Sequence, residues 1–327
     1  MKHNVNRREF LMASAAAGLG LAAAGRPRAH EPQIKEPQVK TTLKKALITG
    51  RPTAAGLKPL KEAGFDGVET GDWGAKPDDA KAARAEAEKV GMRVHAVLRG
   101  WVDFNSKDAD AVAKSIASVE TALRAAAAYG ADAVLLVPCR TGGMAMPEAW
   151  EFDIEFDSKT GHLKRVAAGD NAKYKDYIEA HDWATDSSRE AVKKLIPVAE
   201  ETKVVIALEN VWNNLWVKPD VFKWFVASFG NPWVKAYLDL GNHVKYAPTE
   251  QWVRALGSLL AKCHVKDFKL KDDGHGGDFV NIRDGSVDWP VVRKALDEVG
   301  YSGWMTIEGG NLSLEEHSKR LDLIIAN

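Results

Sequence analysis

The chain has 327 residues, a length that α/β barrels often use as one domain, although two ordinary domains would also fit. Its 45 basic residues balance its 45 acidic ones, so no overall charge favours nucleic acid or an anionic membrane as a partner. The two cysteines, Cys139 and Cys263, are too few for a disulfide framework and fall in predicted strands, where we expect structural thiols. These bounds favour a small, neutral substrate.

Residues 1–40 are predicted to be a targeting segment and a leader that lie outside the folded domain. The segment from Asn6 to Met12 carries Arg7 and Arg8 side by side and precedes an Ala/Gly/Leu run that ends near Ala24. This pattern resembles a twin-arginine export signal, although Asn6 stands where Ser or Thr is usual, and its apolar run is too short to span a bilayer. We therefore expect a cleaved signal, the twin-arginine export machinery as a partner, no permanent membrane anchor, and a periplasmic or otherwise exported protein.

From Ala46 onward, short apolar runs alternate with longer amphipathic ones, which is typical of a parallel sheet with crossover helices. The apolar runs predict strands at 46–50, 65–69, 93–98, 132–139, 204–209, 234–240, 262–268 and 304–308. The amphipathic runs predict helices at 54–63, 77–90, 108–129, 186–202, 219–229, 249–256, 287–299 and 313–325. Eight such pairs predict a single (β/α)8 TIM barrel over residues 41–327. A doubly wound sheet is disfavoured because the first turn lacks a G-x-G-x-x-G fingerprint.

Residues 140 to about 185 interrupt this alternation and predict a long loop after the fourth strand. The segment contains Gly, Pro, several acidic residues and the aromatics Trp150, Phe152, Phe156, Tyr174, Tyr177 and Trp183. Loops of this length inside a compact domain usually act as lids or binding loops, and this one would lie on the face where the strands end. A surface embellishment or a contact in a homo-oligomer is the alternative.

Titratable groups stand at or near the ends of six predicted strands, where barrel enzymes carry their function. They are Glu69, His95, Glu209, Asp239, His264 and Glu308. The last four lie on successive strands and form a set of three carboxylates and one imidazole, which suits Mn²⁺, Mg²⁺, Co²⁺ or Zn²⁺. A single strand-end Glu is more often a cap or an ion-pair partner, so the hypothesis of a metal site depends on all four converging.

Five motifs surround these residues: Leu208-Glu209-Asn210, Tyr237 to Asn242, His264-Val265-Lys266-Asp267, Val287-Asp288-Trp289-Pro290, and Gly300 to Glu308. They resemble motifs of the xylose isomerase-like TIM barrels, and most of all the sugar phosphate isomerase/epimerase group that includes tagatose epimerases and hydroxypyruvate isomerases. The resemblance covers roughly residue 46 to the C-terminus and is strongest from Glu209 onward.

The resemblance implies the roles of the four strand-end residues. Glu209, Asp239, His264 and Glu308 correspond to the metal ligands of the family. In its ketose epimerases the two glutamates also face each other across the substrate, so Glu209 and Glu308 are the expected catalytic pair. One would remove a proton beside a carbonyl and the other would return it.

Two further positions depart from the pattern of the family. Asn242 stands where the epimerases commonly have a substrate-binding His, and we expect the neighbouring His243 to point away from the substrate because adjacent strand residues face opposite ways. Arg283 occupies the turn before Val287-Asp288-Trp289, where it could bind a carboxylate or a phosphate. A solvated loop charge is the alternative for Arg283.

Other residues are predicted to contact the substrate or support the site. Trp212 and Asn213 would cover the pocket as a stacking surface and an amide donor, with loop packing as the alternative. Asp267 is expected either to orient a metal ligand or to pair with Lys266. The remaining predicted substrate contacts at the mouth are Glu69, His95 and Lys266.

These features together predict an exported, metal-dependent isomerase or epimerase that acts on a keto-sugar or sugar derivative by proton transfer through an enediolate. Export favours unphosphorylated carbohydrates. A lyase or hydrolase acting on 3-keto-glycosides with the same metal site is an alternative. Phosphodiester hydrolysis, as in the endonuclease IV-like barrels, is disfavoured by the zero net charge and the nine histidines. A binding protein without chemistry is disfavoured because binding alone does not require two opposed carboxylates.

Overall fold

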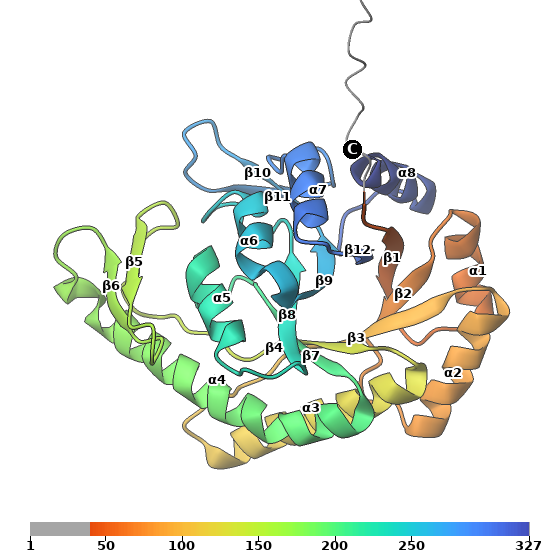
Figure 1. Cartoon of the computed structure of the whole chain (residues 1–327), viewed down its shortest axis with the longest axis horizontal. Coiled ribbons are helices and arrows are strands. Elements are labelled where there is room, and N and C mark those ends of the chain that lie inside the picture. Colours follow the sequence, from red (N-terminus) through yellow and green to blue (C-terminus); the bar gives the residue numbers. More distant parts are fainter. Residues whose placement is uncertain (1–39, 327) are drawn as a thin grey trace, which may run out of the picture. The chain divides into compact units, whose positions relative to one another are not determined.

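The computed structural model describes residues 40–326 (Figure 1). The predicted twin-arginine signal lies outside this range. Within it, no helix is both long enough and apolar enough to cross a bilayer.

Eight parallel strands form the centre of the described domain. They are β1 (Leu43–Thr49), β2 (Gly67–Thr70), β3 (Arg93–Trp101), β4 (Ala133–Val137), β7 (Val205–Glu209), β8 (Val234–Asp239), β9 (Leu260–Val265) and β12 (Gly303–Ile307). Neighbours in this order pair with each other, and β12 pairs with β1 to close the ring. The closed ring confirms the predicted (β/α)8 barrel and leaves none of its strands at an open edge.

The helices lie outside the strands (Figure 1). They are α1 (Ala54–Glu62), α2 (Pro77–Lys89), α3 (Ala109–Tyr129), α4 (Lys175–Thr202), α5 (Pro219–Ala227), α6 (Thr249–Leu256), α7 (Trp289–Glu298) and α8 (Leu314–Ile325). The local sequence explains where several of these helices begin or end. Asp108 caps α3 by accepting from the Asp110 N–H, and Ser313 caps α8 by accepting from the Glu316 N–H. Gly130 ends α3 in the left-handed conformation, at φ 74°.

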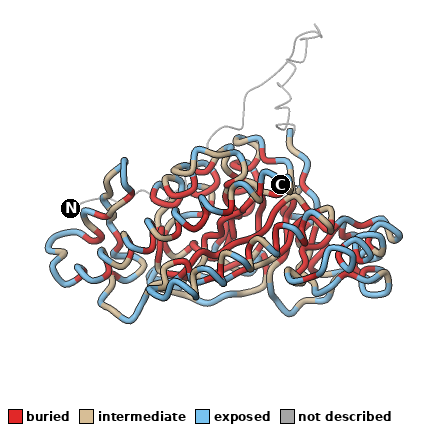
Figure 2. The backbone as a smooth tube through the Cα atoms, turned by 90° about the horizontal axis from the view of Figure 1, so that it is seen from below, coloured by how far each residue is buried: buried red, intermediate tan, exposed pale blue. Residues whose placement is uncertain are grey.

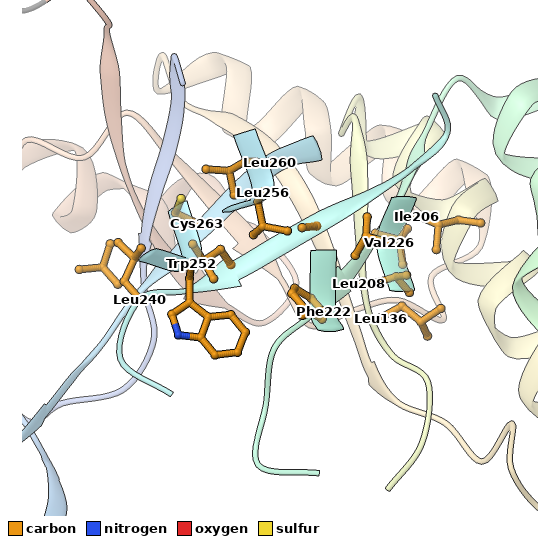
Figure 3. Packing of buried hydrophobic residues seen from close by; sticks show 14 of the residues in the cluster. Leu136, Ile206, Leu208, Phe222, Val226, Leu240, Trp252, Leu256, Leu260 and Cys263 are labelled. Atoms are coloured by element: carbon orange, nitrogen blue, oxygen red, sulfur yellow. The ribbon is translucent and has the colours of Figure 1, made fainter. Parts of the chain in front are cut away.

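Alternate residues of each strand face opposite sides of the barrel wall. Leu136 and Leu208 face outward and belong to the large core between strands and helices, where Phe222 of α5 and Trp252 of α6 also lie (Figure 3). Leu135, Ala207 and Tyr237 belong to a small separate cluster inside the barrel. Figure 2 shows that burial is concentrated along the strands and the helix faces turned toward them. The same period of two turns Glu209 and Asp239 inward, two residues beyond Ala207 and Tyr237.

The long loop predicted at 140–185 is only partly a loop. Residues Phe152–Phe156 (β5) and Leu163–Ala167 (β6) form an antiparallel hairpin, and a 3₁₀ turn at Ala172–Tyr174 (η1) leads directly into α4. Helix α4 therefore begins at Lys175, well before the predicted residue 186. The polar pair Ser187 and Ser188 suggested a helix start, but the Ser187 hydroxyl donates to the Trp183 carbonyl within the helix.

The predicted strand at 262–268 is two strands. Strand β9 ends at Val265, and Asp267–Leu270 (β10) pairs antiparallel with Gly277–Val280 (β11) in a hairpin that was not predicted. The predicted strand ran through the charged pair Lys266 and Asp267, where the structure has the break. A second 3₁₀ turn, at Gly257–Leu259 (η2), connects α6 to β9.

Gly67 in β2 leaves space that the barrel needs. A Cβ at this position would lie 2.4 Å from the Arg93 carbonyl oxygen and 2.6 Å from the Trp304 indole. Trp304 in turn stacks on His95, with ring centroids 4.4 Å apart. The absence of a side chain at Gly67 therefore allows β2 to pack against β3 and against Trp304 of β12.

We expect Gly67→Ala to lower the free energy of unfolding by about 1–3 kcal/mol, because the added methyl group must displace a carbonyl or an indole ring. Urea denaturation measures the change. Gly74→Ala is the matched control, since a Cβ there meets nothing within 4 Å. Equal unfolding midpoints for the two variants would contradict the expectation.

Candidate active site

Four titratable side chains converge at the carboxyl ends of β7, β8, β9 and β12. One ligand atom from each of Glu209, Asp239, His264 and Glu308 lies within 4.8 Å of the others. His264 Nδ1 is 3.1 Å from Glu209 Oε1 and 3.1 Å from Glu308 Oε2. The strand register sets this convergence, because Asp239 and His264 are direct partners across β8 and β9.

The Asp239 carboxylate shows why the cluster suits a cation. Its Oδ1 accepts hydrogen bonds from the N–H groups of Gly241, at 2.8 Å, and Asn242, at 2.6 Å. Its Oδ2 is buried and has no hydrogen-bond partner within residues 40–326; Lys266 Nζ is 3.7 Å away. A buried carboxylate oxygen without a partner is costly. A divalent cation bound by the oxygens and the imidazole would compensate it, so the four residues fit such an ion.

Asn210 fixes the position of Asp239 and was not predicted as a site residue. Its Nδ2 donates to the Asp239 carbonyl at 2.9 Å, and its Oδ1 accepts from the Asp239 N–H at 2.6 Å. Its own carbonyl accepts from Asn242 Nδ2 at 3.1 Å. The side chain thus joins the ends of β7 and β8. Its position directly after Glu209 in the motif Leu208-Glu209-Asn210 could have indicated that it belongs to the site.

Burial and mutual repulsion separate the pKa values of the carboxyls. Burial, with Glu308 and Glu209 nearby, raises the pKa of Asp239 to about 7 despite the opposing charge of Lys266. Burial also raises the pKa of Glu209, although His264 opposes this. Burial alone would raise the pKa of Glu308 as well, but His264 and Lys266 hold it well below its usual range. The two glutamates therefore differ in their readiness to carry a proton.

Lys266 lies beside the cluster, as predicted for a residue at the mouth. Its Nζ is 3.0 Å from Glu308 Oε2 and 3.4 Å from Asn242 Oδ1. Burial would lower the pKa of the ammonium, but Asp239 and Glu308 raise it. Lys266 and Asn242 thus place a cationic donor and an amide next to the metal-competent residues.

Glu69 and His95 were predicted at the mouth, but both are fully buried beneath it. Glu69 Oε2 is 2.7 Å from His264 Nε2, on the edge of the ring that faces away from the cluster. His95 lies near the start of β3, because that strand continues to Trp101, and a register shift between β2 and β3 leaves it without a partner in β2. Its Nε2 is 2.9 Å from Thr306 Oγ1. Both side chains thus bond to other residues of the barrel interior.

Trp212 lies at the rim, where a stacking surface was predicted. Its indole N–H donates to the Asn242 carbonyl, and the ring is 39% exposed. Phe279 of β11 lies 4.9 Å from it, centroid to centroid, and is 44% exposed. Phe279 was missed because the hairpin that carries it was not predicted. The two rings form an apolar wall beside Lys266, whose Nζ lies 5.0 Å from the Phe279 centroid.

The other predicted contacts have structural roles in the loops. Asn213 is buried, its Nδ2 donates to the Cys139 carbonyl at 3.1 Å and its Oδ1 accepts from the Leu215 N–H, so it braces its loop. His243 points away from the cluster, as expected, with Nε2 3.0 Å from the Val211 carbonyl oxygen. Burial lowers its pKa to about 3.

Asp267 fixes the turn that contains Arg283. Its carboxylate accepts from the N–H groups of Arg283, Gly285 and Val287 and from the Trp289 indole. It therefore neither orients a metal ligand nor pairs with Lys266. The Arg283 side chain is exposed and its backbone is left-handed, at φ 74°. The turn is held through the Arg283 backbone, which matches the alternative of a solvated charge.

The segment after β4 reaches the face of the barrel on which the four converging residues lie. Trp150 stacks on His275 of the β10–β11 connection, with centroids 4.1 Å apart. Thr141 accepts a hydrogen bond from Asn214 Nδ2 at 2.8 Å. A cavity of about 420 Å³ opens beside the cluster between Lys266, Phe279 and Glu308. The segment after β4 thus contacts both the loop after β7 and the β10–β11 connection.

Comparison with known proteins identifies the family. A model of the family described as xylose isomerase-like TIM barrel matches residues 57–323, so the chain belongs to this family. No curated protein sequence is detectably similar.

Solved structures share the fold at low sequence identity. The apo form of the 3-keto-D-glucoside 4-epimerase YcjR from E. coli is 14% identical and has a TM-score of 0.62, with 88% of this chain and 100% of that one covered. The IOLI protein with a bound zinc atom is 17% identical, with a TM-score of 0.64 and coverage of 86% and 98%. A D-allulose 3-epimerase from Methylomonas sp., in complex with D-allulose, is 17% identical, with a TM-score of 0.58 and coverage of 86% and 90%.

We expect the affinity of the cluster for Mn²⁺ to rise with pH through about 7 and to keep rising above it. Below that pH, Asp239 carries a proton that must leave before a metal binds, because its pKa is about 7. The rise continues because His264 must lose a proton as well. Burial would lower the pKa of this imidazole, but Glu69, Glu209 and Glu308 raise it. Calorimetric titrations between about pH 5.5 and about pH 8, in buffers of different ionisation enthalpy, measure both affinity and proton release. Asp239→Asn should bind more weakly and show a smaller pH slope. An affinity that does not change with pH would contradict the expectation.

Proposed function

We propose that the protein is a divalent-metal-dependent isomerase or epimerase acting on keto-sugars or sugar derivatives. The observation that carries this proposal is the convergence of Glu209 and Glu308 on one edge of His264, in a cluster completed by Asp239. Sugar epimerases among the solved structures with this fold support the same class of reaction. The predicted export signal supports an exported enzyme that meets unphosphorylated carbohydrates.

Glu209, Asp239, His264 and Glu308 would hold the metal. Mn²⁺, Mg²⁺, Co²⁺ and Zn²⁺ all suit a set of oxygen and imidazole ligands. When bound, such an ion supplies Lewis-acid polarisation of a substrate carbonyl, which acidifies the neighbouring C–H group. Asn210 and Glu69 keep the ligands in place through the hydrogen bonds described above.

The two glutamates divide the proton transfer. Glu308 lines the cavity beside the cluster, which places its carboxylate to accept a proton from the carbon beside the carbonyl. Glu209 lies on the same edge of His264 as Glu308, which places its carboxyl group to return a proton to the enediolate. Removal on one side of the enediolate and return on the other inverts the carbon, which is epimerisation.

The residues around the cavity would bind the sugar itself. Trp212 and Phe279 offer exposed aromatic faces to the C–H groups of a sugar ring, and Lys266 and Asn242 offer polar contacts to its oxygens. A second candidate reaction takes 3-keto-glycosides as substrates, because a 3-keto-D-glucoside 4-epimerase is among the solved structures with this fold. That lyase or hydrolase reaction would release an aglycone, whereas epimerisation would not.

We expect the wild-type protein with Mn²⁺ to exchange the C–H proton beside the carbonyl of a ketose or 3-keto-glycoside for deuterium in D₂O. Glu209→Gln and Glu308→Gln should each slow this exchange by about 10²–10⁴-fold, because each removes one proton-transfer group. NMR spectroscopy of the substrate measures the exchange and detects released aglycone.

The exchange experiment needs a surface control and saturating metal. Glu62→Gln changes an exposed glutamate on α1 and should exchange at the wild-type rate. Bound metal is measured by mass spectrometry, so that loss of metal and loss of the proton carrier are separated. Exchange at the wild-type rate in both site variants would refute the proposed function.

We expect Trp212→Ala to raise KM by about tenfold with a smaller change in kcat, since one aromatic contact contributes on the order of 1 kcal/mol. Trp183→Ala is the matched control, because Trp183 is exposed to a similar degree but lies on α4 beside Lys107. A similar change in KM for the two variants would show that Trp212 has no specific role. Steady-state kinetics on the substrate with measurable turnover provides both constants.

A further inference from the structure

The His264 ring lies between two groups of carboxylates. Its Nδ1 faces Glu209 and Glu308 in the cluster, and its Nε2 faces Glu69 at 2.7 Å. A neutral imidazole carries one N–H group, and a nitrogen that binds a metal must be without a proton. The tautomer of His264 therefore decides whether the cluster has its nitrogen ligand.

Glu69 determines that tautomer through its own hydrogen bonds. Its Oε2 accepts from the Tyr237 hydroxyl at 2.8 Å and lies within hydrogen-bond distance of His264 Nε2. A carboxylate can only accept from a ring nitrogen, and carboxylates face both nitrogens of His264. When a cation replaces the proton at Nδ1, Glu69 keeps the remaining proton on Nε2, so that Nδ1 is the nitrogen that binds the metal. Tyr237 is fully buried, and its ring packs 4.4 Å from the His264 ring, which limits rotation of the imidazole.

The network continues away from the cluster and holds Glu69 in place. The Tyr237 hydroxyl is also 3.5 Å from Thr306 Oγ1, which bonds to His95. Glu69 Oε1 is buried and has no hydrogen-bond partner in the part of the chain that the structure describes. The contacts with Tyr237 and His264 are therefore the ones that compensate the buried carboxylate.

We propose that Glu69 is a positioning residue that makes His264 Nδ1 the metal-binding atom. This inference rests on the proposed metal site and extends it to β2, which contributes no metal ligand. Carboxylates that accept from the second nitrogen of a metal-binding histidine fix its orientation and raise its basicity, and their loss costs about 10–100-fold in metal affinity. Glu69 thus acts through His264 and does not contact the substrate.

The test measures metal affinity and the histidine tautomer in the full protein. Glu69→Gln should lower the affinity for Zn²⁺ and Mn²⁺ by about 10–100-fold in calorimetric titrations. Nitrogen NMR of the wild-type protein with Zn²⁺ should show a proton on His264 Nε2 and a metal-bound Nδ1. In Glu69→Gln, a Zn²⁺-free sample should show a mixture of tautomers. Glu62→Gln should leave affinity and tautomer unchanged.

Tyr237→Phe provides a second variant in case Glu69→Gln does not fold. It removes the hydroxyl that orients Glu69, so we expect about a tenfold loss of metal affinity, the lower end of the range for outer-shell partners. The inference is overturned if Glu69→Gln binds metal with wild-type affinity and still through Nδ1. If Glu69→Gln cannot be purified in folded form, wild-type affinity in Tyr237→Phe overturns it.

The outcomes for this inference and for the proposed function are distinct. If Glu209→Gln loses metal while Glu69→Gln binds like the wild type, the metal site stands and the role of Glu69 is refuted. If the wild-type protein binds neither Zn²⁺ nor Mn²⁺, the proposed function fails first, and the role of Glu69 fails with it.

Discussion

Compensation of buried negative charge is the constraint on which the centre of this barrel depends. Glu209, Asp239 and Glu308 approach one another around His264, with Lys266 alongside. Burying a carboxylate costs several kcal/mol unless a partner replaces its water. The closed ring of strands supplies the rigid frame that holds the carboxylates together against their repulsion, and the donor set defines the kind of ion that would relieve it.

The barrel and the four converging residues could be predicted from the sequence, because both depend on local periodicity. Apolar runs of strand length located the barrel strands. The alternation of side chains along a strand then indicated which residues face the inside of the barrel. Positions set by tertiary packing could not be predicted in this way. His95 was placed at a strand end because nothing local shows that β3 continues to Trp101. The prediction of one strand over residues 262–268 left no place for the β10–β11 hairpin, so Phe279 was missed as well.

The site combines parts with different mechanical character. The four converging residues lie on or directly after barrel strands, so their positions are as rigid as the strand register. The aromatic wall belongs to the connections that follow the barrel strands. There Trp212 bonds to the Asn242 carbonyl and packs against Phe268 and Phe279, and Trp150 stacks on His275. Members of such a family can therefore keep one arrangement of ligands and vary the shape presented to the substrate.

The pairing of β1 with β12 also has a consequence for when the site can exist during synthesis. Strand β12 is the last strand to emerge from the ribosome, and it both closes the ring and precedes Glu308. A nascent chain that lacks it has an open edge on β1 and only three of the four converging residues. Assembly of the four-residue cluster therefore waits until β12 has been synthesised and has paired with β1.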